Sequence, residues 1–134
     1  MFELQLSPRF FETDALGHIN NTVVPVWFEE GRTPIFELFV PQLELGNWNL
    51  ILARISVDFM AQIYYGQPVT IRTGLNKLGN SSFEVWHQVV QAGNVVARGQ
   101  AVMVHFDYQA QRAAPIPAAI RTQLQPHLLP EPDQ

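Results

Sequence analysis

The chain has 134 residues, of which 47% are hydrophobic and 15% are charged, and its formal net charge is −4. This length suits one domain with a single buried core, which we place at residues 1–126, with a flexible C-terminal tail over residues 127–134. A single lysine, Lys77, and the negative charge argue against a broad surface for nucleic acid or an anionic membrane. The absence of cysteine excludes disulfides, thiolate metal sites and cysteine nucleophiles.

The N-terminal residues 1–7 lack the basic flank and long apolar run of a signal peptide. No stretch reaches the roughly 18 consecutive apolar residues of a membrane-spanning helix. We therefore expect a cytoplasmic protein. Since few charges cover the surface, one apolar face is expected to be covered by another subunit, although an ordinary apolar-rich surface would explain the composition equally well.

A strand is predicted at the N-terminus, because Phe2, Leu4 and Leu6 alternate with polar residues. Pro8 interrupts this pattern and cannot donate a backbone hydrogen bond, so we expect an edge position or a bulge there. The alternation then resumes over residues 9–11.

One helix is predicted over residues 22–40, because apolar side chains recur at spacings of three and four. Pro25 falls in its first turn, where N–H groups have no intrahelical partner. Pro34 falls in the interior and removes a hydrogen bond, so a kink is expected near it. Pro41 and Gly46 end the helix. The apolar stripe consists of Val24, Trp27, Phe28, Gly31, Ile35, Leu38 and Phe39.

Four strand signals follow the helix. Gly79-Asn80-Ser81 predicts a hairpin turn between the second and third of these strands, and Gly93-Asn94 predicts the next turn. The last strand is long and largely apolar, which is typical of a strand inside a sheet. The four predicted strands cover residues 54–59, 69–75, 83–89 and 95–106.

A short helix is expected over residues 115–125, and Pro126 ends it. The order of elements is thus a strand, a helix with one apolar stripe, and four strands in antiparallel succession. A sheet of this kind buries its apolar face most simply by wrapping around the helix. The pattern therefore predicts an α+β domain.

This order and two motifs carry a resemblance to a known family. The first motif is Thr13-Asp14-x-x-Gly17-His18-x-Asn20-Asn21, between the first strand and the helix. The second is Phe28-Glu29-Glu30-Gly31-Arg32 on the helix, where the family more often has alanine at position 31. The chain resembles the hotdog-fold acyl-CoA thioesterases of the 4-hydroxybenzoyl-CoA thioesterase type.

The resemblance implies a hotdog fold, in which a five-stranded antiparallel sheet wraps around one long central helix. It also implies a homodimer or homotetramer with the active site between protomers. The implied reaction is hydrolysis of an acyl-CoA to a free carboxylic acid and coenzyme A. Coenzyme A is then part of the substrate, and no metal or redox cofactor is expected.

Asp14 is the main catalytic candidate. It lies a few residues before the predicted helix, so its carboxylate and the unpaired N–H groups of the helix start would face the same space. Asp14 would serve as general base toward water or as nucleophile, whereas the plain alternative is a turn cap. By resemblance Asp14 matches the family's catalytic carboxylate, and the backbone N–H of Asn21 polarises the carbonyl, with Gly17 allowing close approach.

Five further side chains are candidates for substrate binding. The aromatic ones would line an acyl channel, although core packing explains their spacing too. The asparagine is also a natural helix cap, and the serine a turn residue. No histidine shows metal-ligand spacing with another, which argues against a metal site. The five are His18, Asn20, Trp27, Phe59 and Ser82.

Glu29 and Glu30 raise an alternative, because another hotdog branch uses a carboxylate on the central helix. We favour a structural role, since Glu29 precedes Arg32 by three residues and suits a helical ion pair. A hotdog dehydratase and a non-catalytic acyl-CoA binding module stay open as rival functions. The sequence leaves open the acyl group, coenzyme A or acyl-carrier protein as donor, and the arginines that contact phosphates.

Overall fold

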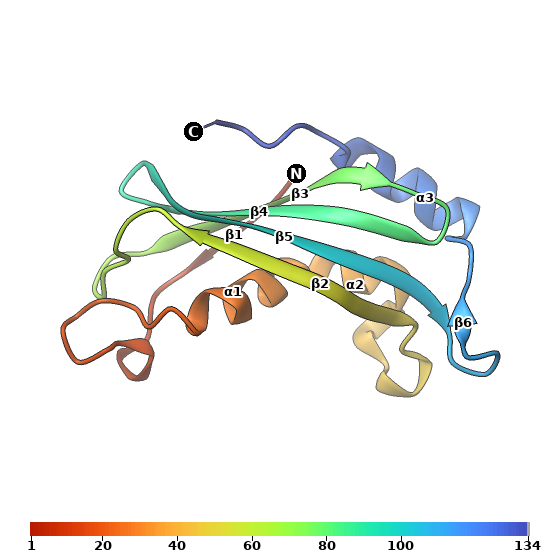
Figure 1. Cartoon of the computed structure of the whole chain (residues 1–134), viewed down its shortest axis with the longest axis horizontal. Coiled ribbons are helices and arrows are strands. Elements are labelled where there is room, and N and C mark those ends of the chain that lie inside the picture. Colours follow the sequence, from red (N-terminus) through yellow and green to blue (C-terminus); the bar gives the residue numbers. More distant parts are fainter. Residues whose placement is uncertain (134) are drawn as a thin grey trace.

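The computed structural model describes residues 1–133, and its largest element is one antiparallel sheet that curves over two helices (Figure 1). The helices are α1 (Val23–Gly31) and α2 (Thr33–Phe39). The strands are β1 (Phe2–Leu6), β2 (Leu50–Phe59), β3 (Val69–Leu78), β4 (Ser82–Gln91) and β5 (Asn94–Asp107), in the spatial order β1-β3-β4-β5-β2. The expected hotdog arrangement is confirmed.

Short elements connect and flank these strands. A two-residue strand, β6 (Arg112–Ala113), pairs with β5 and was not predicted, whereas the expected C-terminal helix forms as α3 (Ala118–Leu124). Among residues 1–133, no helix has the length and hydrophobicity needed to cross a membrane. The 3-10 turns are η1 (Phe10–Glu12), η2 (Pro41–Leu43), η3 (Leu45–Asn47) and η4 (Gln125–His127).

The segment after β1 departs from the prediction. The strand pattern does not resume over residues 9–11, because Phe10–Glu12 forms the turn η1 instead. Its geometry is fixed by Glu12, whose side chain accepts a hydrogen bond from the Arg9 N–H at 2.7 Å. The edge position expected from Pro8 is confirmed, since β1 is an outer strand of the sheet.

The predicted kink near Pro34 is confirmed, but it divides the predicted helix into two short ones. The chain bends at Arg32, which has φ −83° and ψ −7°, two residues before the proline. Pro25 lies in the first turn of α1, as expected. Arg32 lies at this break and is buried, with 1% of its surface exposed.

The helices pack closely on the inner face of the sheet. A Cβ atom on Gly31 would lie 2.9 Å from both Ile71 Cγ2 and Thr73 Oγ1 of β3. A Cβ on Gly99 would lie 2.5 Å from the Phe28 ring. Glycine at these two positions therefore lets α1 approach the strands closely.

A polar cluster is buried under this contact. Arg32 Nη1 lies 3.0 Å from His87 Nε2, and Thr73 Oγ1 lies 3.0 Å from His87 Nδ1. Arginine can only donate, so Nε2 accepts and Nδ1 carries the proton toward the threonine. Phe28 stacks on the imidazole with ring centroids 4.6 Å apart. Burial, and next the charge of Arg32, hold the pKa of His87 well below its usual range, so the ring is neutral.

The ion pair predicted between Glu29 and Arg32 is not formed. Within the described chain no carboxylate lies within 4.0 Å of the Arg32 guanidinium, which points to His87 instead. Both Glu29 and Glu30 are exposed to solvent. Glu29 lies in α1, but this helix ends at Gly31, and the Arg32 side chain contacts His87.

The C-terminal segment lies on the opposite face of the sheet from α1 and α2 (Figure 1). Trp86 Nε1 donates a hydrogen bond to the Leu129 carbonyl at 2.9 Å, and the Arg98 guanidinium donates to the Asp133 carbonyl at 2.7 Å. The final residue, Gln134, lies outside the described part of the chain. The expected flexibility of this tail stays a prediction.

The neutral state of His87 predicts how stability depends on pH. The unfolded chain binds a proton at this residue below a pKa of about 6.5, whereas the folded chain does not. Stability is therefore fully present above that pKa and falls by about 1.4 kcal/mol per pH unit below it, down to the folded-state pKa. Urea unfolding of wild type and His87→Gln, followed from about pH 7.5 to 5.5, measures this slope.

The variant keeps a hydrogen-bonding side chain that does not titrate. Below the histidine pKa, the free energy of unfolding should therefore fall more steeply with decreasing pH in wild type than in His87→Gln. The expected difference in slope is about 1.4 kcal/mol per pH unit. Equal slopes for the two proteins would show that His87 is protonated in the folded chain.

Candidate active site

The stretch between β1 and α1 closes into a tight loop. Thr13 and Ile19 pair as an antiparallel bridge, and the Asp14 N–H donates to the His18 carbonyl at 2.8 Å. Between them the backbone takes left-handed conformations, with φ 85° at Gly17. Glycine adopts this conformation without strain, which explains the glycine in the motif.

Asp14 uses its two carboxylate oxygens differently. Oδ1 accepts hydrogen bonds from the N–H groups of Leu16 at 2.9 Å and His18 at 3.2 Å, so Asp14 does cap a turn. Oδ2 lies 3.7 Å from His18 Nδ1, which is longer than a hydrogen bond. Within residues 1–133 no donor reaches Oδ2. One oxygen thus holds the loop, and the other is available to a ligand or water.

Glu12 anchors the loop to α1 and was missed by the sequence analysis. Its buried carboxylate accepts hydrogen bonds from the Arg9 N–H, the Arg9 guanidinium and, at 3.1 Å, Trp27 Nε1. Burial raises the pKa of this carboxyl, but the hydrogen bonds and charge of Arg9, with Trp27, outweigh it and bring the pKa below its usual value. The Glu12 carbonyl also accepts from the Asn20 N–H.

The start of α1 leaves one amide for a ligand. Asn20 Oδ1 accepts hydrogen bonds from the Thr22 N–H at 3.0 Å and the Thr22 hydroxyl at 2.9 Å, so this side chain forms a turn just before α1, whose N-cap residue is Thr22. The Asn20 carbonyl accepts from the Val23 N–H. Among the described residues, no hydrogen bond uses the Asn21 N–H.

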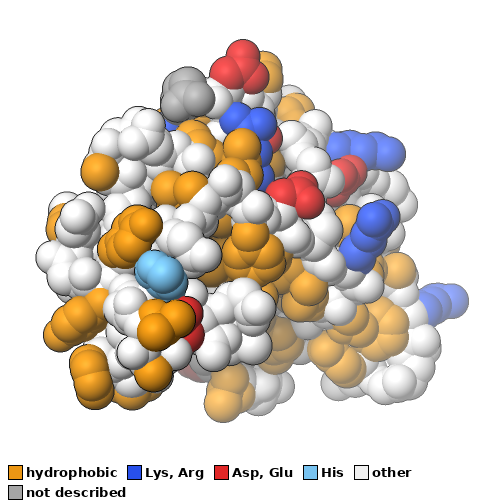
Figure 2. Space-filling view, turned by 60° about the vertical axis from the view of Figure 1, so that its left-hand side comes forward, with side chains coloured by type: hydrophobic (Ala, Val, Ile, Leu, Met, Phe, Trp, Pro, Cys, Tyr) orange, Lys and Arg blue, Asp and Glu red, His pale blue; other side chains and the backbone are white. Residues whose placement is uncertain are grey.

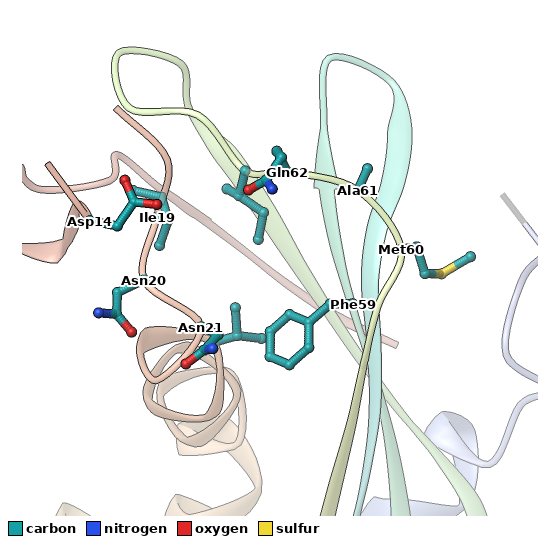
Figure 3. A pocket seen from close by; sticks show the side chains of 10 residues that line it. Asp14, Ile19, Asn20, Asn21, Phe59, Met60, Ala61 and Gln62 are labelled. Carbon is teal, nitrogen blue, oxygen red and sulfur yellow. The ribbon is translucent and has the colours of Figure 1, made fainter. Parts of the chain in front are cut away.

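A cavity of about 620 Å³ brings these groups together. It lies between the loop, the start of α1 and the segment that follows β2 (Figure 3). The Phe59 ring extends from the end of β2 toward α1, whereas Met60 points away from it (Figure 3). The lining residues are Asp14, Ile19, Asn20, Asn21, Val24, Phe59, Met60, Ala61, Gln62 and Ile63.

Four of the eight predicted site residues line this cavity: Asp14, Asn20, Asn21 and Phe59. Gly17 and His18 belong to the same loop but flank the cavity, and the His18 ring packs edge-on against Tyr64.

Trp27 and Ser82 do not reach the cavity. Trp27 lies in the core, is 2% exposed and donates a hydrogen bond from its indole N–H to Glu12. Ser82 begins β4, whereas Gln91, at the other end of that strand, bonds Tyr64 beside the loop. Ser82 is therefore separated from the loop by the length of a ten-residue strand, about 30 Å.

The segment over residues 60–63 contributes to the cavity and was not predicted. The Ile63 carbonyl accepts a hydrogen bond from the Ile19 N–H at 2.8 Å, which fixes this segment against the loop. No residue type in it signals chemistry. Only its place directly after a predicted strand would have pointed to it.

The end of the molecule that carries the loop is rich in exposed apolar side chains. Figure 2 shows hydrophobic side chains beside histidine and acidic side chains on this end. The residues are Phe10, Phe11, Leu16, Tyr64 and Tyr65, each at least 47% exposed. Within residues 1–133, no three His, Asp or Glu side chains cluster as metal ligands would. The site thus combines one carboxylate, one free amide and apolar surface.

Comparison with known proteins assigns this arrangement to a family. Residues 8–124 match the family model described as the thioesterase-like superfamily. A 1,4-dihydroxy-2-naphthoyl-CoA hydrolase of Synechococcus sp. (strain RCC307) is 30% identical over 126 residues, which cover 87% of this chain and 95% of that protein.

Solved structures give the same result. A predicted thioesterase from Bacillus stearothermophilus is 44% identical, with a TM-score of 0.94 and 98% of each chain covered. A thioesterase from Thermus thermophilus, complexed with coenzyme A and Zn, is 31% identical, with a TM-score of 0.82 and 92% of this chain and 97% of that chain covered. The chain therefore belongs to the thioesterase-like superfamily, as a thioester hydrolase with the hotdog fold.

Proposed function

We propose that this chain hydrolyses an acyl-CoA to a free carboxylic acid and coenzyme A, with Asp14 and the Asn21 N–H as its catalytic groups. The observation that carries the proposal is that Asp14 and Asn21 line one cavity, while Asp14 Oδ2 and the Asn21 N–H make no hydrogen bond within the described chain. The substrate named for the Synechococcus relative and the coenzyme A in the Thermus structure support the thioester class.

The Asn21 N–H is the proposed donor to the thioester carbonyl. As the tetrahedral intermediate forms, negative charge grows on that oxygen, and a preorganised amide stabilises it. Removing one such donor typically raises the barrier by about 2.7–4 kcal/mol. The dipole of α1 adds about 0.3–1 kcal/mol at an exposed site. Pro25 has no N–H and Val23 donates to Asn20, so the first turn offers few other amides.

Asp14 is the proposed oxygen-activating group. As general base, Oδ2 takes a proton from water, the resulting hydroxide attacks the carbonyl carbon, the C–S bond breaks and the proton passes to the thiolate. As nucleophile, Oδ2 attacks the carbonyl carbon, and the C–S bond breaks to release the coenzyme A thiolate and leave an anhydride. Water then cleaves the anhydride, giving back the Asp14 carboxylate and the free acid, and a proton from this water passes to the thiolate. Both routes need no metal or redox cofactor, and treatment with EDTA should leave turnover unchanged.

Asp14→Asn is expected to abolish most turnover while preserving the fold. An asparagine Oδ1 can still accept from the Leu16 and His18 N–H groups, so the loop keeps its shape, but an NH₂ group replaces Oδ2. We expect a loss of about 10²–10⁴-fold, measured as thiol release from a panel of acyl-CoAs. Near-wild-type activity would remove Asp14 from the mechanism.

Asp107→Asn is the matched control. Asp107 Oδ1 accepts from the Gln109 and Ala110 N–H groups, which is the same kind of turn cap away from the cavity. This variant should keep its activity. In wild type, release of free thiol separates a hydrolase from a dehydratase, and tight acyl-CoA binding without turnover would identify a binding module.

We further propose that two copies join through β2. This strand pairs only with β5 among the described strands, so its other edge presents unpaired backbone groups. Apolar side chains along β2 and α1 are exposed beside that edge: Val26, Leu52, Ile55, Phe59 and Met60. A second copy would cover them. Phe59 and Met60 also line the Asp14 cavity, so the active site would lie at the boundary between the two subunits.

Ile55→Lys is expected to separate the dimer into monomers, because it places a charge at the middle of this edge. Analytical ultracentrifugation measures the mass, and thiol release should fall with it. Gln123→Lys, at an exposed position on α3, is the control and should leave both unchanged. An Ile55→Lys protein that keeps the wild-type mass would contradict the β2 interface.

A further inference from the structure

The segment over residues 60–67 follows β2, and its first four residues line the Asp14 cavity (Figure 3). On one side it pairs with the loop between β1 and α1. The pairings are the hydrogen bond from the Ile19 N–H to the Ile63 carbonyl at 2.8 Å, that from the Tyr65 N–H to the Gly17 carbonyl at 2.9 Å, and the bridge between His18 and Tyr64. The segment and the loop that carries Asp14 therefore form one hydrogen-bonded unit.

Gln91, at the end of β4, holds this segment from the other side. Its Oε1 accepts a hydrogen bond from the Tyr64 N–H at 2.9 Å, and its Nε2 donates to the carbonyls of Tyr64 at 2.9 Å and Gln67 at 3.1 Å. A backbone N–H can only donate, so Oε1 is the atom that faces it. Gln91 is 4% exposed, and among the described residues it is the only side chain that hydrogen-bonds to residues 60–67.

Few other contacts attach the segment to the sheet. The N–H groups of Met60 and Ala61 donate to the Val96 carbonyl, which fixes the beginning of the segment to β5. Beyond Ala61, the hydrogen bonds that reach other parts of the described chain go to the loop or to Gln91. Without Gln91, residues 62–67 would be hydrogen-bonded only to the loop itself. The Gln91 side chain thus anchors both to β4.

The position of Asp14 depends on that of His18. The Asp14 N–H donates to the His18 carbonyl at 2.8 Å, and Asp14 Oδ1 accepts from the His18 N–H at 3.2 Å. His18 is the loop residue paired with Tyr64, and their rings pack edge-on with centroids 5.2 Å apart. Because Gln91 bonds both backbone groups of Tyr64, as a neighbouring strand would, it fixes the residue against which this end of the loop is placed.

We propose that Gln91 is a positioning residue for the reaction, because it holds the loop that places the Asp14 carboxylate against the thioester carbonyl. This inference rests on the proposed thioesterase function. Gln91 does not line the cavity, so it acts on turnover without touching the substrate. A displacement of reacting groups by about 1 Å can lower a rate by about 10²-fold.

Gln91→Met removes the three hydrogen bonds and keeps an unbranched side chain of similar length. The loop should then lose its attachment to β4, and kcat should fall about 10–100-fold. The rate is measured as thiol release from the acyl-CoA that wild type hydrolyses best. A variant with the wild-type kcat would contradict the positioning role.

Gln88→Met is the matched control. Gln88 is a second buried glutamine of β4, but its Nε2 donates to the Pro132 carbonyl of the C-terminal segment, on the face of the sheet away from the helices. This variant also loses a buried amide, yet it should keep the wild-type kcat. An equal loss of kcat in Gln88→Met and Gln91→Met would indicate general damage to the sheet and overturn the inference.

A double substitution separates positioning from a general loss of structure. In the Asp14→Asn protein no carboxylate is left to be placed, so adding Gln91→Met should change the residual rate by less than about twofold. A residue with a merely structural role would lower the rate by the same factor in both backgrounds. Equal factors would therefore overturn the inference.

Hydrogen exchange in wild type tests the contact even where Gln91→Met does not fold. The Tyr64 N–H has the Gln91 side chain as its acceptor, so its exchange should be slower than in an unstructured peptide by at least about a hundredfold. NMR measures this rate residue by residue. Exchange at the rate of an unstructured peptide would show that Gln91 does not hold the segment, and would overturn the inference.

The two proposals fail in different ways. If wild type releases no thiol from any acyl-CoA, the thioesterase function fails. If wild type hydrolyses acyl-CoAs and Gln91→Met does so with the same kcat, only the role of Gln91 fails.

Discussion

The geometry of the active-site loop depends on one buried carboxylate. Glu12 accepts hydrogen bonds from Arg9 on its own turn and from Trp27 on α1, so it joins the loop to this helix. A carboxylate in this position holds two elements at a fixed distance with charge-assisted bonds. Asp14 and the Asn21 N–H line one cavity because this joint holds the loop against the helix start.

The same chain accepts an unfavourable group in its core. Arg32 is 1% exposed with a neutral histidine as its partner, and a purely apolar residue would fill the space without desolvating a charge. Arg32 lies at the break between α1 and α2, two residues before Pro34. A buried cation with an unpaired N–H group costs stability. Proteins generally retain destabilising groups of this kind at functional sites.

Local patterns predicted much of the fold, and long-range contacts account for what they missed. Alternation placed β3, β4 and β5, and prolines placed the helix break, because both signals lie within a few residues. Glu12 was missed because its partner Trp27 is 15 residues away, and Arg32 because His87 is 55 residues away. Trp27 was expected at a pocket, but it lies in the core, where its indole N–H donates a hydrogen bond to the buried Glu12 carboxylate.

In the candidate site, too, local sequence patterns predicted some residues, whereas those positioned by long-range contacts were missed. Residues 13–21 form one continuous loop, so a motif within them placed Asp14, Asn20 and Asn21 at the cavity. Ser82 lies away from this cavity because it begins β4, whose other end lies near the loop, and a hairpin signal does not report the direction of a strand. The segment over residues 60–63 carries no chemical signal of its own, and only the hydrogen bond from Ile19 to Ile63 reveals its place.

The free edge of β2 links these observations into one physical argument. A lone subunit exposes an unpaired strand, apolar side chains beside it and the Asp14 cavity at its end. An antiparallel pairing of the strand with itself satisfies the backbone groups and buries the apolar side chains. It also places the Asp14 cavity of each subunit at the boundary between the two. One symmetric contact would thus complete both the fold and the active site.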